Sequence, residues 1–403
     1  MFSLDNFYYI LHNNLISQFV NNTSVYFSPF GTYDNRCYYD LPYGTLRQHH
    51  DADVWSCKRA WFHCYFFDQE PIYDSTVIDN SMLCDWTTGP RRISILANSE
   101  KSQIKQQIVK HKGLYDWYYF FHGFAALDWY RDFQYVKQNS FDQFTKVFIC
   151  YNHLISKYRS YRLHLVSNLI NQDLVRFGKV SLFLNDSLGT WQDTVTDPLT
   201  PLDNRARVKI YQALKNRSDP LIIDTVPNGA FSAKVDLSEL SDALWHVVTE
   251  TVYFQPKLHL TEKVFKPIIA QRPFILVAAP GNLAYLRSYG FKTFDHWIDE
   301  SYDLETDNYI RIEKITQEIA RLCAMPTSQL KHMHEEMQEI LLYNYRHFYG
   351  EFRTIITNEL VDNFEGILAQ INNGRMPNNH SRHHQRFELD KNYLNEVKQR
   401  LLK

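Results

Sequence analysis

The sequence carries almost no net charge, because 43 Lys and Arg stand against 45 Asp and Glu, which gives a formal net charge of −2. Proteins that coat DNA or RNA usually have a basic excess, so the composition disfavours that class. A local basic face remains compatible with a balanced total, and residues 375–403 are locally basic.

Cysteine pairs and long apolar runs are also missing. The six cysteines are scattered and form neither a CxxC pair nor a zinc-ligand spacing, which indicates reduced thiols in a reducing compartment. No apolar run reaches the roughly 18 residues of a membrane-spanning helix. Residues 1–20 lack the positive region and cleavage site of a signal peptide, so we expect an amphipathic helix there. These absences predict no membrane span and a cytoplasmic location.

The chain does have length and many aromatic side chains. At 403 residues it is long enough for two domains, since single cores stop growing at roughly 250–300 residues. Aromatic residues make up 15% of the sequence. Tyr and Trp bury a large apolar body and keep a polar tip, which suits clefts for sugars or bases but suits a bulky core equally well.

Short apolar runs, rich in β-branched and aromatic residues, alternate with helical patterns along the first two thirds of the chain. Such runs are typical of parallel strands covered on both faces, and their alternation with helices predicts an α/β architecture. From about residue 309 the pattern is mainly helical. The predicted strands lie at 24–30, 61–68, 92–99, 117–123, 146–152, 221–225, 243–250 and 273–279.

A weak seam in this pattern falls near 152–160. We therefore predict an N-terminal α/β domain over 1–155, a C-terminal α/β domain over 156–350, and C-terminal helices with a basic tail over 351–403. Residues 372–387 are predicted to form a linker or exposed loop before a short tail helix.

The segment "HLTEKVFKPIIAQRPFILVAAPGNLAYLRSYG" (259–290) concentrates charge beside a buried strand. Thr261 is expected to cap a helical turn, and Glu262 then occupies the first turn, where the helix dipole favours a carboxylate. Pro267 fits the first position of the following helix. A strand over 273–279 and a helix closed by Gly290 complete one α-β-α unit.

Ligands of parallel sheets bind outside the carboxyl ends of the strands. Glu250 and Thr251 come at one predicted strand end, and the charges of 262–266 come at a helix start, so both can line one crevice. There a glutamate can hold ribose hydroxyls and a lysine can neutralise a diphosphate. The structural alternative is a capping turn with a surface pair of Glu262 and Lys266. Spacing alone leaves both interpretations open.

"HLTEKVFKPI" resembles the "TEK" donor motif of fucosyltransferase-like glycosyltransferases, and resembles more closely phage-encoded glycosyltransferases with a "TEKxFKPI…PF" signature. "KVFICYNHLISKYRSYRLHLVSNL" (146–169) and "YFFDQEPIY" (65–73) are also similar to that group. The likeness spans roughly residues 60–300. It implies the GT-B architecture, which is two facing Rossmann-like α/β domains, here with a helical C-terminal extension. The nucleotide-sugar then binds the C-terminal domain and the acceptor mostly the N-terminal one.

The resemblance also implies roles for individual residues. Glu262 corresponds to a ribose ligand and Lys263 to a phosphate ligand. Arg162 corresponds to a second phosphate cation, with Arg159 as its rival, and Lys266 is assigned to the donor by charge and position. The full set of expected donor-binding residues also includes Thr261, Glu250 and Thr251.

An inverting transfer needs a carboxylate that takes the proton of the acceptor hydroxyl from the other face of the sugar. "FFDQEPIY" places Asp68 and Glu70 two residues apart at a predicted strand end. One of them is the expected catalytic base, with Glu70 preferred, and a polar turn is the structural alternative. His122 is a second candidate, although a histidine after an apolar run is more often a hydrogen-bonded core residue.

Metal binding is not expected. "QHHDADVW" (48–55) contains Asp51 and Asp53, which resembles the DxD that holds a metal and diphosphate in other glycosyltransferases. However, such a DxD normally ends a hydrophobic strand, and "GTLRQHH" is not one. We therefore predict no metal and no cofactor, the nucleotide-sugar being the donor substrate.

The sequence thus predicts a metal-independent, inverting glycosyltransferase, in the host cytoplasm if it is phage-encoded. The acceptor is either a glycan or a hydroxymethylated base in DNA, and the latter requires base flipping. A non-catalytic nucleotide- or sugar-binding protein is the alternative from a different class. The sugar, the nucleotide and the oligomeric state stay open.

Overall fold

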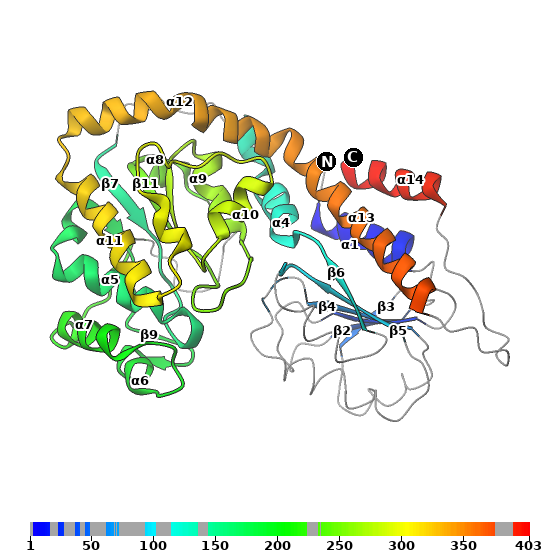
Figure 1. Ribbon diagram of the computed structural model, residues 1–403, viewed down its shortest axis with the longest axis horizontal. Coiled ribbons are helices and arrows are strands. Elements are labelled where there is room, and N and C mark those ends of the chain that lie inside the picture. The colour runs from blue at the N-terminus through cyan, green and yellow to red at the C-terminus, as the bar shows by residue number, and fades with distance from the viewer. Residues whose placement is uncertain are drawn as a thin grey trace. The chain divides into compact units, whose positions relative to one another are not determined.

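The computed structural model describes residues 3–16, 23–27, 37–40, 45–48, 62–67, 69, 71, 93–101, 114–135, 144–223, 233, 235–374 and 390–403 (Figure 1). The chain folds into two compact units. The N-terminal unit comprises Met1–Asp128 together with Arg353–Lys403, and the C-terminal unit comprises Trp129–Phe352. None of the helices in the described ranges is long and apolar enough to cross a membrane.

A mixed sheet forms the centre of the N-terminal unit, with strand order β3-β2-β1-β4-β5-β6. Strands β1, β4, β5 and β6 pair in parallel, while β2 and β3 extend the sheet in antiparallel fashion. Apolar runs such as "FHCYFF" supply the buried strands. The strand bounds are Thr23–Phe27 (β1), Cys37–Asp40 (β2), Thr45–Gln48 (β3), Phe62–Phe67 (β4), Ile93–Asn98 (β5) and Leu114–Tyr118 (β6).

Helices from both ends of the chain complete this unit. The first is α1 (Leu4–Ile10), which continues as a π-helical turn over Leu11–Leu15. Helices α13 (Glu351–Gly374) and α14 (Lys391–Leu402) join it beside the sheet (Figure 1). The indole N–H of Trp117 donates to the carbonyl of Leu360 at 3.1 Å, and its ring lies 4.8 Å from that of Phe364. The C-terminal helices are thus part of the N-terminal core.

A wholly parallel sheet forms the centre of the C-terminal unit, with strand order β12-β11-β7-β8. Every residue of β11 (Ala243–Thr249) is buried, as expected for a strand covered on both faces. It pairs with β12 (Phe274–Val277), with Thr249 opposite Val277. The other strands are β7 (Lys146–Cys150) and β8 (Gly178–Val180). The predicted α/β class with a helical C-terminal region is therefore confirmed.

Helices flank this parallel sheet along the whole unit. They are α5 (Tyr161–Asn171), α6 (Trp191–Thr196), α7 (Asn204–Leu214), α8 (Leu237–Ser241), α9 (Phe265–Ile269), α10 (Asn282–Ser288), α11 (Asn308–Ala324) and α12 (Thr327–Tyr349). A short hairpin of β9 (Asn185–Asp186) and β10 (Gly189–Thr190) precedes α6.

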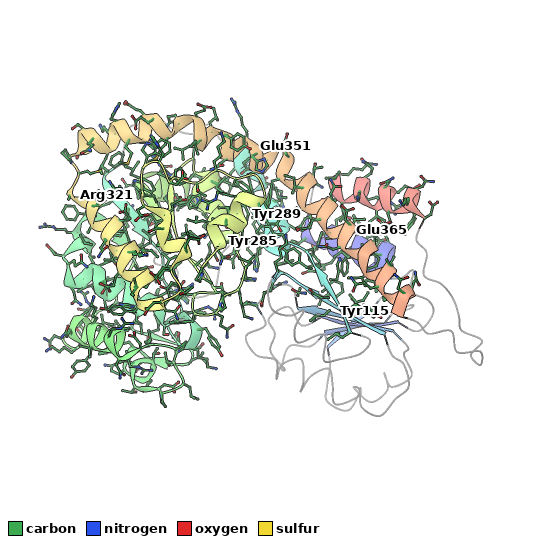
Figure 2. The ribbon with its side chains drawn as sticks, in the orientation of Figure 1. Tyr115, Tyr285, Tyr289, Arg321, Glu351 and Glu365 are labelled. Carbon is green, nitrogen blue, oxygen red and sulfur yellow. The ribbon has the colours of Figure 1, made fainter. Side chains whose placement is uncertain are left out.

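The end of α10 illustrates how closely this unit is packed. Tyr285 and Tyr289 lie one turn apart with ring centroids at 5.3 Å (Figure 2), and Gly290 follows with a left-handed φ of +91°. A Cβ on Gly290 would lie 2.8 Å from the ring of His347. The expectation that a glycine closes this helix is confirmed, and both its φ and the close ring explain the residue.

Three expectations need correction. The boundary expected at 155 lies too late, because β7 pairs with β11 and so belongs to the C-terminal unit. The strand expected over 117–123 ends at Tyr118, and α4 (Phe121–Trp129) takes up the rest, since an apolar run alone does not distinguish a strand from a buried helix. Of the strand expected over 221–225, Leu221 forms an isolated bridge with Leu182.

Candidate functional site

A buried carboxylate marks the carboxyl end of β11. Glu250 follows the strand directly and its backbone N–H donates to the carbonyl of Val277 at 3.0 Å, so the parallel pairing with β12 fixes its position. Its side chain is fully buried. The carboxylate accepts the backbone N–H of Thr261 at 3.2 Å and the Thr261 hydroxyl at 2.5 Å. The strand end is thus tied to the loop that carries the TEK motif.

The TEK motif forms a single 3₁₀ turn over Glu262–Val264 that leads into α9. The expectation that the Thr261 side chain caps this turn is wrong, because its hydroxyl donates to Glu250 instead. Pro267 is the third residue of α9 rather than the first. A proline is still tolerated there, because N–H groups of the first helical turn have no partner within the helix.

Lys263 carries the accessible charge of this turn. Its ammonium donates to Thr261 Oγ1 at 3.0 Å and to Glu262 Oε1 at 3.2 Å, while 31% of its side chain stays exposed. Glu262 therefore forms an ion pair with its neighbour in sequence. Hydrogen bonds connect the buried carboxylate of Glu250 to Thr261, and Thr261 to the ammonium of Lys263. These bonds hold the Lys263 cation in a defined place outside the parallel sheet.

Burial controls the electrostatics of this cluster. It raises the pKa of Glu250, and the nearby charge of Glu262 acts in the same direction. The Lys263 ammonium and the hydrogen bonds from Thr261 lower that pKa and offset part of the rise. The Tyr130 hydroxyl donates to the Glu262 carbonyl at 3.5 Å, and burial, followed by the charges of Glu262 and Glu250, raises the pKa of Tyr130.

Arg162 contacts backbone carbonyls at the carboxyl end of β11. Its side chain is buried, with 4% exposed, and its guanidinium donates to the carbonyls of Leu154 at 3.0 Å and Thr249 at 3.2 Å. A third contact reaches the carbonyl of Glu250 at 3.4 Å, which also accepts the Tyr161 hydroxyl. In this arrangement Arg162 links the loop after β7 to the end of β11, and its role as a phosphate ligand stays a prediction.

The structure describes some of the other expected site residues and not others. Thr251 is buried next to Glu250, and its N–H lies 3.3 Å from Glu250 Oε2. Arg159 and Lys266 are half-buried. Asp68, Glu70, Asp51 and Asp53 lie outside the described residues, so the predicted catalytic base stays a prediction.

His122 lies in the first turn of α4 in the N-terminal unit and is 6% exposed. Its Nε2 lies 2.9 Å from the carbonyl oxygen of Gln69. This burial and this contact are typical of a hydrogen-bonded core histidine. Within the described ranges, no group of three or more His, Cys, Asp or Glu side chains is arranged to hold a metal ion.

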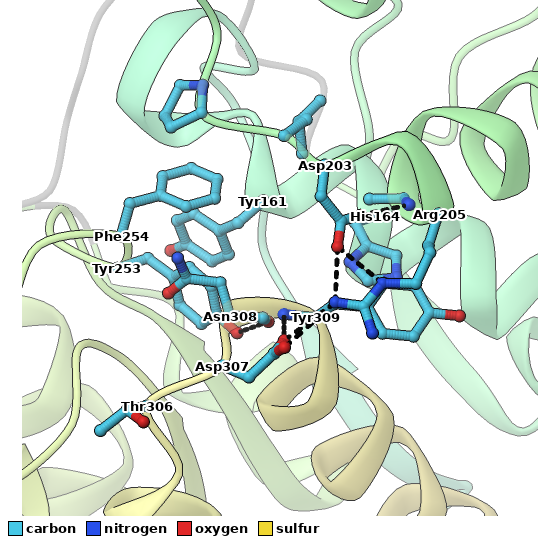
Figure 3. A pocket seen from close by; sticks show the side chains of 13 residues that line it. Tyr161, His164, Asp203, Arg205, Tyr253, Phe254, Thr306, Asp307, Asn308 and Tyr309 are labelled. Carbon is cyan, nitrogen blue, oxygen red and sulfur yellow. Dashed lines mark hydrogen bonds and ion pairs between the residues drawn. The ribbon is translucent and has the colours of Figure 1, made fainter.

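A pocket of about 250 Å³ opens beside this cluster in the C-terminal unit (Figure 3). It lies between the start of α5, the residues that precede α7, and the start of α11. Aromatic side chains form much of its wall, namely Tyr161, Tyr253, Phe254 and Tyr309. Tyr161 connects the pocket to the cluster, because its hydroxyl donates to the Glu250 carbonyl.

Charged groups line the other side of the pocket. Arg205 lies between two carboxylates, 2.7 Å from Asp203 and 3.1 Å from Asp307, and its guanidinium lies 4.2 Å from the ring centroid of Tyr309. The ring of His164 stacks on that of Tyr309, with the centroids 4.9 Å apart. These contacts hold Arg205, His164 and Tyr309 in place along the lining of the pocket.

The sequence did not point to this pocket. Its lining comes from four separate segments, at 161–164, 201–206, 253–254 and 306–309, and no spacing rule joins them. One local signal was present: Asp307 caps α11 by accepting the N–H groups of Tyr309 and Ile310. That pattern locates a helix start, although it does not reveal what lies opposite.

No protein-family model matches the chain, and the search of curated proteins finds no match either.

Proposed function

We propose that the protein is a glycosyltransferase that moves a sugar from a nucleotide-sugar to an acceptor hydroxyl, with inversion and without a metal. The proposal includes the GT-B architecture of two facing Rossmann-like domains. The observation that carries it is the position of Lys263, a partly exposed cation held through Thr261 and Glu250 at the carboxyl end of a parallel sheet. Open α/β sheets bind their ligands at that edge.

The chemistry of transfer explains why a fixed cation is useful there. As the glycosidic bond breaks, negative charge grows on the diphosphate of the leaving nucleotide. A cation that is already oriented stabilises this charge without reorganising at the moment of reaction. The contacts of Lys263 with Thr261 and Glu262 provide that orientation. Lys266, half-buried one turn further on, is proposed to add a second positive charge.

Glu262 is proposed to bind the donor ribose. Its side chain is nearly buried and one carboxylate oxygen already accepts from Lys263. A carboxylate fixed in this way accepts hydrogen bonds from vicinal hydroxyls at little further cost in side-chain entropy. The acceptor side, with Asp68 or Glu70 as the base, rests on the sequence resemblance alone.

The test is donor binding and turnover by the full chain. Calorimetry with UDP-, GDP- and ADP-sugars identifies the nucleotide, and release of nucleoside diphosphate in the presence of acceptors measures transfer. Lys263→Ala is expected to weaken binding of the preferred nucleoside diphosphate roughly tenfold or more, because it removes a charge-assisted contact. Lys215→Ala, which removes an exposed lysine after α7, is the matched control and is expected to bind normally.

Two outcomes would replace this function. Nucleotide-sugar binding without release of nucleoside diphosphate, under any acceptor tested, would favour a non-catalytic binding protein. If the Lys263→Ala protein and the wild type bound the nucleoside diphosphate with equal affinity, the donor site would not lie at the TEK turn. The salt dependence of activity distinguishes the two acceptor classes. Activity on hydroxymethylated DNA is expected to fall steeply as the salt concentration rises, and activity on a glycan is not.

A further inference from the structure

We infer that Phe352, the last residue of the C-terminal unit, is a positioning residue for the donor site, and that Tyr130, the second residue of that unit, supports it. Both side chains are fully buried, so they act on a ligand only through the TEK turn. This inference rests on the proposed function. It adds that donor affinity depends on the two places at which the chain passes from one unit to the other.

Phe265 is the residue through which Phe352 acts. It directly follows the TEK turn and begins α9. Its backbone N–H donates to the carbonyls of Glu262 and Lys263, and each of those carbonyls lies in a rigid peptide plane with the next residue. A shift of Phe265 therefore moves the turn that carries the Lys263 ammonium.

Three other phenylalanine rings enclose the ring of Phe265. The centroid distances are 5.1 Å to Phe348, 5.2 Å to Phe352 and 5.7 Å to Phe291, and all four side chains are buried. Phe352 lies on α13, next to Glu351, which is labelled in Figure 2. Because protein interiors are close-packed, the Phe265 ring has little room to move unless one of these neighbours changes.

Tyr130 reaches the same turn from the start of the unit. Its hydroxyl donates to the Glu262 carbonyl at 3.5 Å, which is long for such a bond, so we expect it to contribute less than the rings. The carbonyl of Tyr130 accepts the hydroxyl of Tyr349 on α12 at 2.8 Å. The first residues of the unit are thus bonded to its last helical turns, close to Phe352 in sequence.

The TEK turn is therefore anchored at both of its ends. Glu250 ties the first end to the parallel sheet through Thr261, and the Phe265 ring ties the second end to the junction of α12 and α13. The contacts of Lys263 with Thr261 and Glu262 orient the ammonium relative to the turn. The two anchors orient the turn relative to the unit.

This second orientation matters for a charge that acts on a reacting phosphate. A displacement of about 1 Å, caused by a change far from the chemistry, can lower a rate by roughly a hundredfold. Functional groups keep their geometry only when the residues behind them are locked by packing. Phe265 and Phe352 provide that packing behind Lys263.

A purely structural role for Phe352 predicts a different result from a positioning role. Lost stability lowers the fraction of folded molecules and leaves the dissociation constant of the folded ones unchanged. A displaced turn raises the dissociation constant itself. Calorimetry separates the two, because it measures the binding stoichiometry and the dissociation constant in one titration.

The experiment titrates the full chain and its variants with UDP, GDP and ADP. Phe352→Leu removes the ring beside Phe265 and keeps an apolar side chain. Phe364→Leu is the matched control, because Phe364 is equally buried on the same helix and packs on Trp117 of the N-terminal unit.

A second pair of variants keeps the test valid if Phe352→Leu does not fold. Tyr130→Phe keeps the ring and removes the hydroxyl that reaches the TEK turn. Tyr345→Phe is its control, because the Tyr345 hydroxyl also donates to backbone carbonyls, those of Phe133 and Gln134, which lie outside the turn.

Phe352→Leu is expected to raise the dissociation constant of the preferred nucleoside diphosphate roughly three- to tenfold. Tyr130→Phe is expected to raise it about twofold, because the bond it removes is long. Both controls are expected to match the wild type. Adding Phe352→Leu to Lys263→Ala is expected to weaken binding little further, since a lysine that is absent cannot be displaced.

The results that overturn the inference differ from those that overturn the proposed function. If Lys263→Ala weakens binding and both Phe352→Leu and Tyr130→Phe bind as the wild type does, the inference fails while the donor site stands. It also fails if Phe364→Leu weakens binding as much as Phe352→Leu, or if the effects of Phe352→Leu and Lys263→Ala add in full. If the wild-type protein binds no nucleoside diphosphate, the proposed function fails and the inference fails with it.

Discussion

In each unit a parallel strand ends at a buried polar residue, but the two residues have different hydrogen-bond partners. In the N-terminal unit, β5 ends in Asn98, whose side-chain amide donates to Asp116 on the neighbouring strand and whose Oδ1 accepts the N–H of Glu100 at 3.0 Å. In the C-terminal unit, β11 leads to Glu250, which reaches a residue eleven positions on, in the loop before α9. Asn98 and Glu250 are both buried.

The difference lies in how far the buried polar group reaches. Asn98 bonds to residues of its own strand end and of the adjacent strand, so it stabilises the edge of the sheet. Glu250 bonds to Thr261, and Thr261 in turn contacts a lysine with 31% of its side chain exposed. Comparable strand ends therefore serve as a sheet anchor in one unit and, we propose, as the base of a ligand site in the other.

The largest effect is expected from Arg162→Ala. The substitution removes a donor from the carbonyls of Leu154, Thr249 and Glu250. The Glu250 carbonyl keeps the Tyr161 hydroxyl, and each of the other two that is left without a partner costs about 1–3 kcal/mol. We expect the free energy of unfolding of the C-terminal unit to fall by about 3 kcal/mol or more. Hydrogen exchange followed by mass spectrometry is expected to show faster exchange in peptides of 144–180 and 243–254, with unchanged exchange over 114–120.

Arg159→Ala serves as the control for this substitution, because Arg159 is half-buried and is expected to alter exchange little. Arg162→Ala with normal exchange but weak nucleotide binding would contradict the structural role. Such a result would restore the phosphate contact that the resemblance implies for Arg162.

A smaller loss of stability is expected in acid, beginning in the C-terminal unit. Burial lowers the pKa of His246 to about 3, so below pH 6.5 the unfolded state binds a proton that the folded state does not. Stability therefore falls as pH decreases from 6.5 toward 3, by about 2 kcal/mol at pH 5 for this group. Urea titrations at pH 7 and pH 5 measure the change, and His246→Gln is expected to reduce it.

Glu313 continues that trend at lower pH. Burial opposes its ionisation, but hydrogen bonds from His164, Lys209 and Asn168 outweigh burial and lower its pKa to about 2. Its stabilising contribution is complete above the unfolded value of 4.5 and is lost as pH falls toward 2. An N-terminal unit that unfolded first between pH 6 and 4 would contradict this ordering.

The smallest effect is expected from Lys101→Ala in the N-terminal unit. Lys101 follows β5 and pairs with Glu359 on α13 at 2.7 Å, with 40% of its side chain exposed. Exposed ion pairs contribute roughly 0.2–1 kcal/mol, so the unfolding free energy of this unit is expected to change by less than about 1 kcal/mol. A loss above 2 kcal/mol in urea unfolding would show that this strand end, too, depends on a distant charged contact.

Periodicity was sufficient to predict the long amphipathic elements. Helices α11 and α12 lie in the region from about residue 309 that the apolar pattern marks as mainly helical, and β11 and β12 lie within the expected runs. Hydrophobic spacing determines such elements directly, because each must bury one face or both faces. It does not distinguish a buried strand from a buried helix, which explains the error at α4.

Side-chain partners in the site were less predictable. The sequence predicts that Glu250 lies near the segment 261–263, and it does. However, the Thr261 hydroxyl donates to Glu250 at the strand end and does not cap its own turn. The Arg162 guanidinium donates to backbone carbonyls. These contacts depend on the path of the loop 151–160, which the sequence does not predict. The pocket was missed because its four segments meet through tertiary packing alone.

The return of α13 and α14 to the N-terminal unit has a consequence for synthesis of the protein. Residues 129–352 have all been translated before residues 353–403 are added. The N-terminal sheet, in contrast, lacks the partners of Trp117, which are Leu360 and Phe364, until the last segment has been made. Multidomain chains generally fold in the order in which their domains emerge. We expect the nascent chain to reverse that order here, so that a premature stop codon before residue 353 would leave the first-made sheet without α13 and α14 while sparing the later-made unit.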